Sequence, residues 1–293
     1  MNEELPPQKG LRRYRYRNDE EELNDARTSV RRWWFEYLRL SKDYWLVSQT
    51  NGDTTDKNFN MLWRKFGDIH NTTFDDWWLK KGRHIFREQT SAPKVELVNG
   101  GLVTHRPLSD TSVLIQVPLI LRQETVMRQI RKLLASIENV RPKNILATST
   151  SKFPINPVSF RLEVLQKMHE VWCEHRDLIA KPIVLKQFEG NAELNERKRN
   201  NLFELGKRLN ISPSNALLHN DDDEMKRRRN RMRATVSRYI RRANQLIYNV
   251  ECGHFPVFKS PPANVPSRFT DKQREAHKEL EQQWWALDLR VKI

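Results

Sequence analysis

The first clear hydrophobic pattern lies in residues 29–48, where apolar and aromatic side chains recur with the period of an α-helix. The residues on the predicted inner face are Trp33, Tyr37, Leu40, Tyr44 and Val47. A second helix is predicted over residues 59–69 and a third after the capping residue Thr73. Six of the nine tryptophans lie between positions 33 and 78. Residues 29–90 are therefore predicted to form a Trp-rich helical module.

The period of the pattern changes after this module. Two short strands are predicted around Asn99-Gly100, because this pair accepts the positive φ angles of a tight hairpin turn. A third strand is predicted over residues 111–119, which are rich in β-branched side chains. A helix over residues 122–137 has its apolar side chains on one face and would cover the strands. Residues 91–150 are therefore predicted to form a small antiparallel sheet with a covering helix.

Helical periodicity returns in residues 151–253. One helix is predicted to start at Asn156-Pro157, where Asn can cap and Pro fits the first turn, and to end before Lys181-Pro182. Two more helices are predicted over residues 195–209 and 224–250. This part of the chain is predicted to be a helical, basic, nucleic-acid-binding region.

The remaining segments complete the predicted organisation. Residues 1–28 are charged and polar and are predicted to be a mobile arm. Residues 254–269 are rich in proline and are predicted to be a linker, followed by a C-terminal helix in residues 270–293 that Thr270 caps. The predicted fold class is α+β and mostly helical.

The charge of the chain favours a polyanionic partner. The 293 residues carry a formal net charge of +15, which says little about fold but attracts nucleic acid. The N-terminus has no apolar signal segment, and no apolar run approaches the ~18 residues of a membrane span. Cys173 and Cys252 lie far apart and are expected to be reduced thiols. A cytoplasmic protein that contacts no membrane is expected.

The charge is concentrated in one predicted helix. Nine basic residues and no acidic residue lie between positions 226 and 250. They are Lys226, Arg227, Arg228, Arg229, Arg231, Arg233, Arg238, Arg241 and Arg242. Like charges at helical spacing repel, so these residues are predicted to bind nucleic acid. The alternative is a solvated face whose arginine stems cover apolar neighbours. The acidic run "HNDDDE" before them suits a helix N-terminus, where the macrodipole favours negative charge.

A family resemblance points to DNA. The phrase "LFELGKRLNISPSNALL" resembles the core of helix-turn-helix regulators, and "TVSRYIRRA" resembles their recognition helix, so the likeness covers residues 202–242. Gly206 would allow the helices to approach closely. The resemblance implies that the second helix enters the major groove. Here that helix is short and leads into "HNDDDE", which DNA repels, so the contact is predicted on the later basic helix.

The tryptophans allow two interpretations. The phrases "WW…YLRLS…Y" and "FGD…F…WW" resemble uncharacterised proteins of bacterial and phage mobile elements, a likeness that implies no activity. The N-terminal tryptophans are predicted to be core. Trp284 and Trp285 follow a proline-rich segment and are predicted to anchor a protein partner or a second copy of the chain.

The sequence has few signs of an enzyme. It has no Gly-rich phosphate loop, no zinc spacing and no Gly-x-Ser-x-Gly motif. The run that holds His219, Asp221, Asp222, Asp223 and Glu224 could bind a divalent ion, but a solvated helix start is favoured. No catalytic residue, no metal and no cofactor are predicted.

The hypothesis from the sequence is a nucleic-acid-binding protein, regulatory or architectural, of a bacterial or phage mobile element. Duplex DNA is the favoured partner. The first alternative is an assembly protein that docks to other subunits through Trp-rich surfaces and touches packaged nucleic acid. The second alternative is a metal-dependent nuclease.

Overall fold

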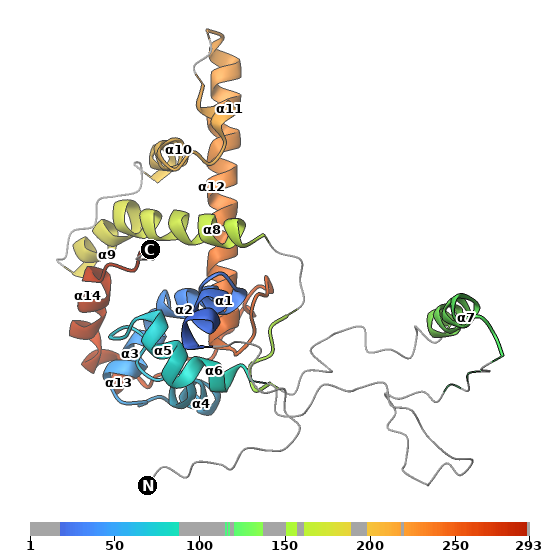
Figure 1. Cartoon of the computed structure of the whole chain (residues 1–293). Coiled ribbons are helices and arrows are strands. Elements are labelled where there is room, and N and C mark those ends of the chain that lie inside the picture. The colour runs from blue at the N-terminus through green and yellow to red at the C-terminus, as the bar shows by residue number, and fades with distance from the viewer. Residues whose placement is uncertain are drawn as a thin grey trace. The chain divides into compact units, whose positions relative to one another are not determined.

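The computed structural model describes residues 18–87, 120–136, 151–156, 161–188, 198–217 and 220–291, together with Ile115 and Val117 (Figure 1). The chain divides into two units, one of residues 1–13 and 88–151 and the other of residues 14–87 and 152–293. Each unit is described by itself below.

The described residues are mostly helical and contain no β-strand, so the predicted α+β class is wrong. Of the third predicted strand, Ile115 and Val117 are described and neither is in a strand. The predicted hairpin around Asn99-Gly100 lies outside the described residues. An isolated bridge pairs Ile155 with Phe255 and does not extend into a strand.

The N-terminal module of the larger unit is built from short helices. They are α1 (Asp19–Arg27), α2 (Val30–Arg39), α3 (Lys42–Gln49), α4 (Lys57–Phe66) and α5 (Phe74–Trp77), continued by a π-helical turn (Trp78–Gly82) and α6 (Arg83–Ile85). The single helix predicted over residues 29–48 is two helices, because the Ser41 hydroxyl accepts a hydrogen bond from the Tyr44 N–H at 2.9 Å and starts α3. The predicted cap at Thr73 is confirmed.

The last third of the predicted mobile arm is ordered helix. Helix α1 buries Leu23 and Ala26 against the module. Arg27 binds Asp75 through two hydrogen bonds of 3.1 and 2.6 Å. Residues 19–27 therefore belong to the body of the larger unit.

The module is held together by an aromatic core. The ring of Trp34, which is fully buried, lies 5.2–6.2 Å from the rings of Phe66, Phe86, Phe153 and Phe255. Five of the six tryptophans of this module are buried, and Trp63 is half-buried. The prediction that these tryptophans form a core is confirmed for the five.

The next helices form a nearly continuous rod. Helix α8 (Leu162–His175) continues through a π-helical turn (Arg176–Ala180) into α9 (Lys181–Phe188). The prediction that this helix ends before Lys181-Pro182 is wrong. The wider π turn directly before Pro182 changes the hydrogen-bond register, which lets a proline without an N–H continue the helix. The predicted start at Pro157 lies outside the described residues.

Helices α10 (Lys198–Arg208), α11 (Pro213–Ala216) and α12 (Asp222–Glu251) follow. Helix α12 spans 30 residues, or about 45 Å. Its C-terminal half packs against α2 and α8, and its N-terminal half extends past α8 with α10 and α11 against it (Figure 1).

The two ends of the segment predicted as a linker pack on the body, whereas residues 259–267 between them are exposed. Phe255 and Phe269 are buried at its two ends. It leads into α13 (Asp271–Ala276), which has the predicted capping box of Thr270 and Gln273, and α14 (Lys278–Ala286). Helix α14 contacts α3 and α9. The C-terminal helices thus belong to the body of the larger unit.

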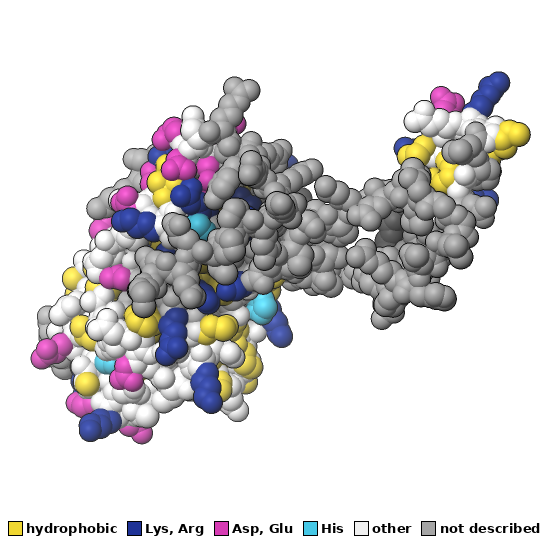
Figure 2. All heavy atoms as spheres, turned by 60° about the horizontal axis from the view of Figure 1, so that its bottom comes forward, with side chains coloured by type: hydrophobic (Ala, Val, Ile, Leu, Met, Phe, Trp, Pro, Cys, Tyr) yellow, Lys and Arg dark blue, Asp and Glu magenta, His cyan; other side chains and the backbone are white. Residues whose placement is uncertain are grey.

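In the smaller unit, the described residues form α7 (Gln123–Ser136). Met127 and Leu133 are exposed on it. Hydrophobic, basic and acidic side chains are all visible on the surface of the smaller unit (Figure 2).

Candidate nucleic-acid interface

Helix α12 begins as the acidic run predicts. The Asp221 carboxylate caps the helix by accepting a hydrogen bond from the Asp223 N–H at 2.9 Å. Asp222, Asp223 and Glu224 occupy the first turn, where the exposed N–H groups and the macrodipole stabilise negative charge. The run therefore has a structural role at the start of the basic helix.

One face of α12 is apolar and buried. Met232, Val236 and Ala243 are fully buried on it. Gly206 of α10 faces this side, and a Cβ atom placed on it would lie 2.6 Å from the Met232 sulfur and 2.9 Å from Val236 Cγ2. The predicted close approach at Gly206 is confirmed, and it fixes the N-terminal half of α12 against α10.

The rest of the circumference of α12 carries the basic residues. Seven of the nine are exposed: Lys226, Arg227, Arg229, Arg231, Arg238, Arg241 and Arg242. Arg228 and Arg233 are half-buried. Because a helix turns about 100° per residue, Arg227, Arg231, Arg238 and Arg242 fall within about 60° of one another over about 22 Å. These four residues are called the basic stripe below.

Few carboxylates of the described residues lie near these cations. Glu224 pairs with Arg228 at 3.2 Å and with Arg231 at 3.7 Å. In the described part of the chain, no carboxylate lies within 4 Å of the guanidinium groups of Arg227, Arg238 or Arg242. By contrast, acidic and basic side chains are interspersed on the face of the larger unit that Figure 2 shows. The exposed cations of α12 therefore have few described carboxylates to compensate them.

The basic stripe continues onto the segment predicted as a linker. The Asn249 amide donates to the Lys259 carbonyl at 2.7 Å, and the Gln245 amide donates to the Ser260 hydroxyl at 2.9 Å. The guanidinium of Arg242 lies 5.3 Å from the centre of the Phe258 ring. These contacts place the exposed Lys259 beside the end of the stripe. Sequence reasoning missed Lys259, because only the folded structure brings it to α12.

The helix-turn-helix-like segment has an unusual second helix. Helix α10 ends at Arg208, and α11 is a single turn of four residues. Leu205 of α10 packs with Val171 and Val236 in a small core of its own. A single turn offers little surface to a groove, whereas α12 offers several turns. The exposed basic residues of α12 therefore offer a longer surface than the four residues of α11.

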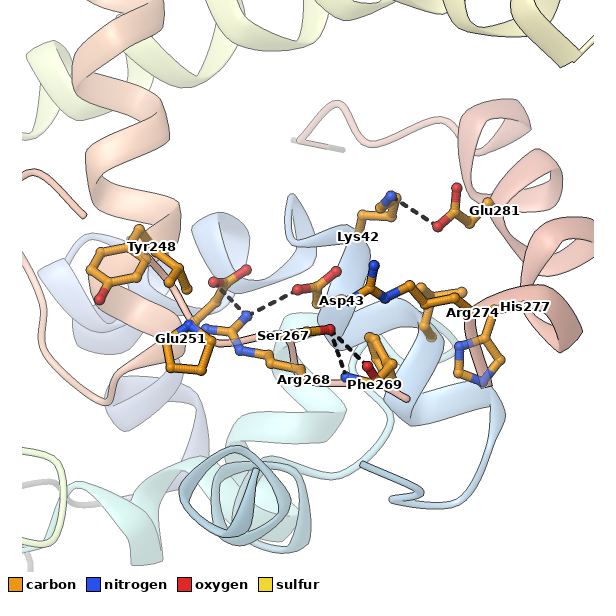
Figure 3. Close-up of a pocket in the computed structure, with 13 residues that line it drawn as sticks. Lys42, Asp43, Tyr248, Glu251, Ser267, Arg268, Phe269, Arg274, His277 and Glu281 are labelled. Atoms are coloured by element: carbon orange, nitrogen blue, oxygen red, sulfur yellow. Dashed lines mark hydrogen bonds and ion pairs between the residues drawn. The ribbon is translucent and has the colours of Figure 1, made fainter. Parts of the chain in front are cut away.

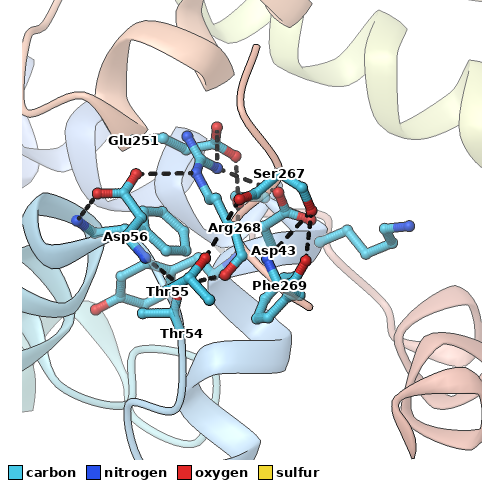
Figure 4. Close-up of polar contacts among 12 residues, drawn as sticks. Asp43, Thr54, Thr55, Asp56, Glu251, Ser267, Arg268 and Phe269 are labelled. Atoms are coloured by element: carbon cyan, nitrogen blue, oxygen red, sulfur yellow. Dashed lines mark hydrogen bonds and ion pairs between the residues drawn. The ribbon is translucent and has the colours of Figure 1, made fainter. Parts of the chain in front are cut away.

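The C-terminal end of α12 is anchored by a buried charge. Arg268 bridges Glu251 at 2.7 Å and Asp43 at 3.3 Å, and Asp56 lies at 3.8 Å (Figure 4). Its guanidinium also stacks 4.0 Å from the centre of the Phe59 ring. Burial opposes the charge, but Glu251 and then Asp43 outweigh burial and hold the pKa of Arg268 above its ordinary value. The network ties α12 to α3, α4 and the C-terminal segment.

A pocket of about 380 Å³ lies beside this network (Figure 3). Its charges compensate one another, since Lys42 pairs with Glu281 at 2.9 Å and Arg268 pairs with Glu251. Burial raises the pKa of Glu251. The pocket therefore presents no net positive surface to a polyanion.

A larger cavity of about 810 Å³ lies between the N-terminal module and α8. The buried His169 and Cys173 line it, with Nδ1 and Sγ 3.7 Å apart. Burial lowers the pKa of His169 to about 3 and raises the pKa of Cys173 to about 12. The two groups are thus a neutral imidazole and a thiol at neutral pH, which does not favour nucleophilic chemistry.

The acidic run does not assemble a metal site in the described residues. No group of three potential metal ligands comes together in the parts of the chain that are described. Asp221 caps α12 and Glu224 binds two arginines, while His219 lies outside the described residues.

The two C-terminal tryptophans differ in exposure. Trp284 is buried, and the guanidinium of Arg176 lies 4.4 Å from the centre of its ring. Arg176 donates to the backbone carbonyls of Trp284, Trp285 and Leu287 at 2.7–3.0 Å. Trp285 is half-buried. The structure thus places Trp284 in the core rather than on a surface that a partner could reach.

Comparisons with protein-family models, with characterised proteins and with solved structures found no significant match to this chain. Among the helices of the described residues, none has the length and apolar character that crossing a membrane requires.

Proposed function

We propose that this protein binds nucleic acid, and duplex DNA in particular, through the exposed basic face of α12. The observation that carries the proposal is the basic stripe, four arginines aligned over about 22 Å on a helix whose other face is fixed in the core. The described carboxylates compensate few of these charges. A polyanion would offset the repulsion that remains among them. A regulatory or architectural role suits a surface that binds but has no assembled catalytic group in the described residues.

The interface is rigid, which lowers the cost of binding. Arg268 holds the C-terminal end of α12, and Gly206 allows α10 to pack closely against its N-terminal half. The arginines therefore stand on a fixed scaffold, and only their side chains lose freedom when they contact phosphates.

The test compares two triple variants of equal charge. The stripe variant carries Arg227→Gln, Arg231→Gln and Arg238→Gln, and Gln keeps the helix because it is a good helix former. The body variant carries Arg64→Gln, Arg87→Gln and Lys272→Gln at exposed positions away from α12. Fluorescence anisotropy with a labelled duplex is expected to show at least a tenfold weaker Kd for the stripe variant and less than a threefold change for the body variant. Equal losses in the two variants would show that net charge, not α12, attracts DNA.

A further inference from the structure

The N-terminal half of α12 is open on most of its circumference. Between positions 226 and 242, only Met232 and Val236 are buried, and both face α10. This half of the helix lies beyond α8 in Figure 1, with α10 and α11 against one side. A helix exposed in this way can be surrounded by a partner on more than one side.

The exposed side chains fall into three sectors. With about 100° per residue, the basic stripe occupies one sector of about 60°. A second row, formed by the exposed Lys226 and Arg229 and the half-buried Arg233, occupies another sector of about 60° on the far side of the exposed surface. Between the two rows lie Asn230, Ala234 and Ser237, which are exposed and uncharged, and Arg241. Cations thus flank a middle sector of small and polar side chains.

This arrangement matches the major groove of B-form DNA. The groove is about 12 Å wide, admits one α-helix and has phosphates along both of its edges. A helix seated in it directs one face at the base edges and its flanks at the two phosphate rows. Asn hydrogen-bonds the N6 and N7 groups of adenine, Arg hydrogen-bonds guanine, and Ser can hydrogen-bond either base.

We propose that residues 226–242 of α12, which extend from its N-terminal half to Arg242, enter the major groove of duplex DNA and that Asn230, Ser237 and Arg241 read base edges there. This inference rests on the proposed function and adds a geometry and a sequence preference to it. Ala234 leaves room in the middle sector for the helix to approach the bases closely.

Two features define the limits of the contact. Asp223 lies in line with the middle sector about 10 Å before Asn230, so the first turn of α12 lies outside the groove or meets a cytosine amino group. The guanidinium of Arg233 donates to Asn230 Oδ1 at 3.3 Å, and this bond exchanges for contacts to phosphate and base on binding. The deep, narrow major groove of double-stranded RNA does not admit the helix, so duplex RNA is predicted to bind more weakly than DNA.

The test is a selection from a pool of randomised DNA duplexes with the full chain, followed by affinity measurements on the enriched sequence, on random duplex and on RNA duplex. The reader variant carries Asn230→Ala and Ser237→Ala, which keep charge and favour helix. The control variant carries Asn58→Ala and Ser214→Ala, both at exposed positions, with Ser214 on α11.

The wild-type protein is expected to enrich a sequence and to bind it at least tenfold more tightly than random duplex. The reader variant is expected to lose most of this ratio and to keep its affinity for random duplex, while the control variant keeps both. If no sequence is enriched, if the reader variant keeps the ratio, or if duplex RNA binds as tightly as DNA, the groove contact is excluded and a grip on the backbone remains. If the wild-type protein binds no duplex at all, the proposed function itself fails.

Discussion

Arg268 shows how much of this fold depends on single buried side chains. It contacts carboxylates from three different segments of the chain and a phenylalanine ring. Only 8% of its surface is exposed. Removal of one partner from such a group leaves the other charges buried without compensation. The cost is expected to exceed that of any exposed ion pair in the described residues.

The variant Arg268→Leu is therefore predicted to lose about 3–5 kcal/mol of unfolding free energy, because Glu251 and Asp43 lose their counter-charge. Urea denaturation followed by tryptophan fluorescence measures the loss. The matched variant Arg290→Gln removes an arginine whose side chain is 52% exposed and is predicted to cost at most about 1 kcal/mol. A loss below about 1 kcal/mol for Arg268→Leu would show that the network contributes little.

The buried His169 and the half-buried His70 make stability depend on pH. Burial lowers the pKa of His70 to about 4 and of His169 to about 3, whereas both titrate near 6.5 in the unfolded chain. Below pH 6.5 the unfolded state therefore binds protons that the folded state does not, and stability falls as pH falls toward 4. Glu251 acts in the opposite sense, because burial raises its pKa in the folded state.

Between pH 6.5 and 4.5, the two histidines together are predicted to remove roughly 2–4 kcal/mol from the unfolding free energy. Denaturation at a series of pH values measures this loss. NMR titration of the imidazole signals identifies its source, since His169 is expected to stay neutral at pH 5. A His169 signal that titrates near pH 6.5 would contradict this explanation.

At the scale of elements, the C-terminal helices are part of the body. Arg176 binds three carbonyls at the end of α14, where the helix dipole is negative, and stacks on Trp284. Trp45 of α3 donates to the Leu280 carbonyl at 3.3 Å. These contacts join three helices that lie far apart in the sequence.

Trp284→Ala is predicted to cost about 3–5 kcal/mol, the usual cost of a large cavity. Trp285→Ala removes a half-buried ring on the same helix and serves as the matched control, with a predicted cost below about 2 kcal/mol. Thermal unfolding of the two variants compares them directly. If Trp284→Ala melts like the wild-type protein, the ring is not part of the core.

The sequence predicts elements better than it predicts contacts between them. The 3.6-residue period suffices to predict α12 and its buried face, because this signal is local. The strand predicted over residues 111–119 depended on β propensity, a context-dependent signal, and the described Ile115 and Val117 within it are not in a strand. No local signal could place Lys259 beside the basic stripe, since this contact needs the fold of the segment after α12.

At the scale of the whole molecule, the placement of charge matters more than its sum. The net charge of +15 would attract a polyanion from any side. The larger unit mixes both signs on the face in Figure 2, whereas α12 gathers seven exposed cations in 17 residues. Nucleic acid is therefore expected to bind at one surface, that of α12. The slope of log affinity against log salt concentration is then expected to report the number of phosphates contacted there.

The salt dependence of DNA affinity tests the central claim most directly. Each phosphate contact contributes roughly 0.9 to the slope of log affinity against log salt concentration. The stripe variant, with three arginines replaced, is predicted to have a slope shallower than that of the wild-type protein by about 2.7. The body variant, with the same loss of charge, is predicted to keep the wild-type slope. A stripe variant that is correctly folded and keeps the wild-type slope would contradict the account.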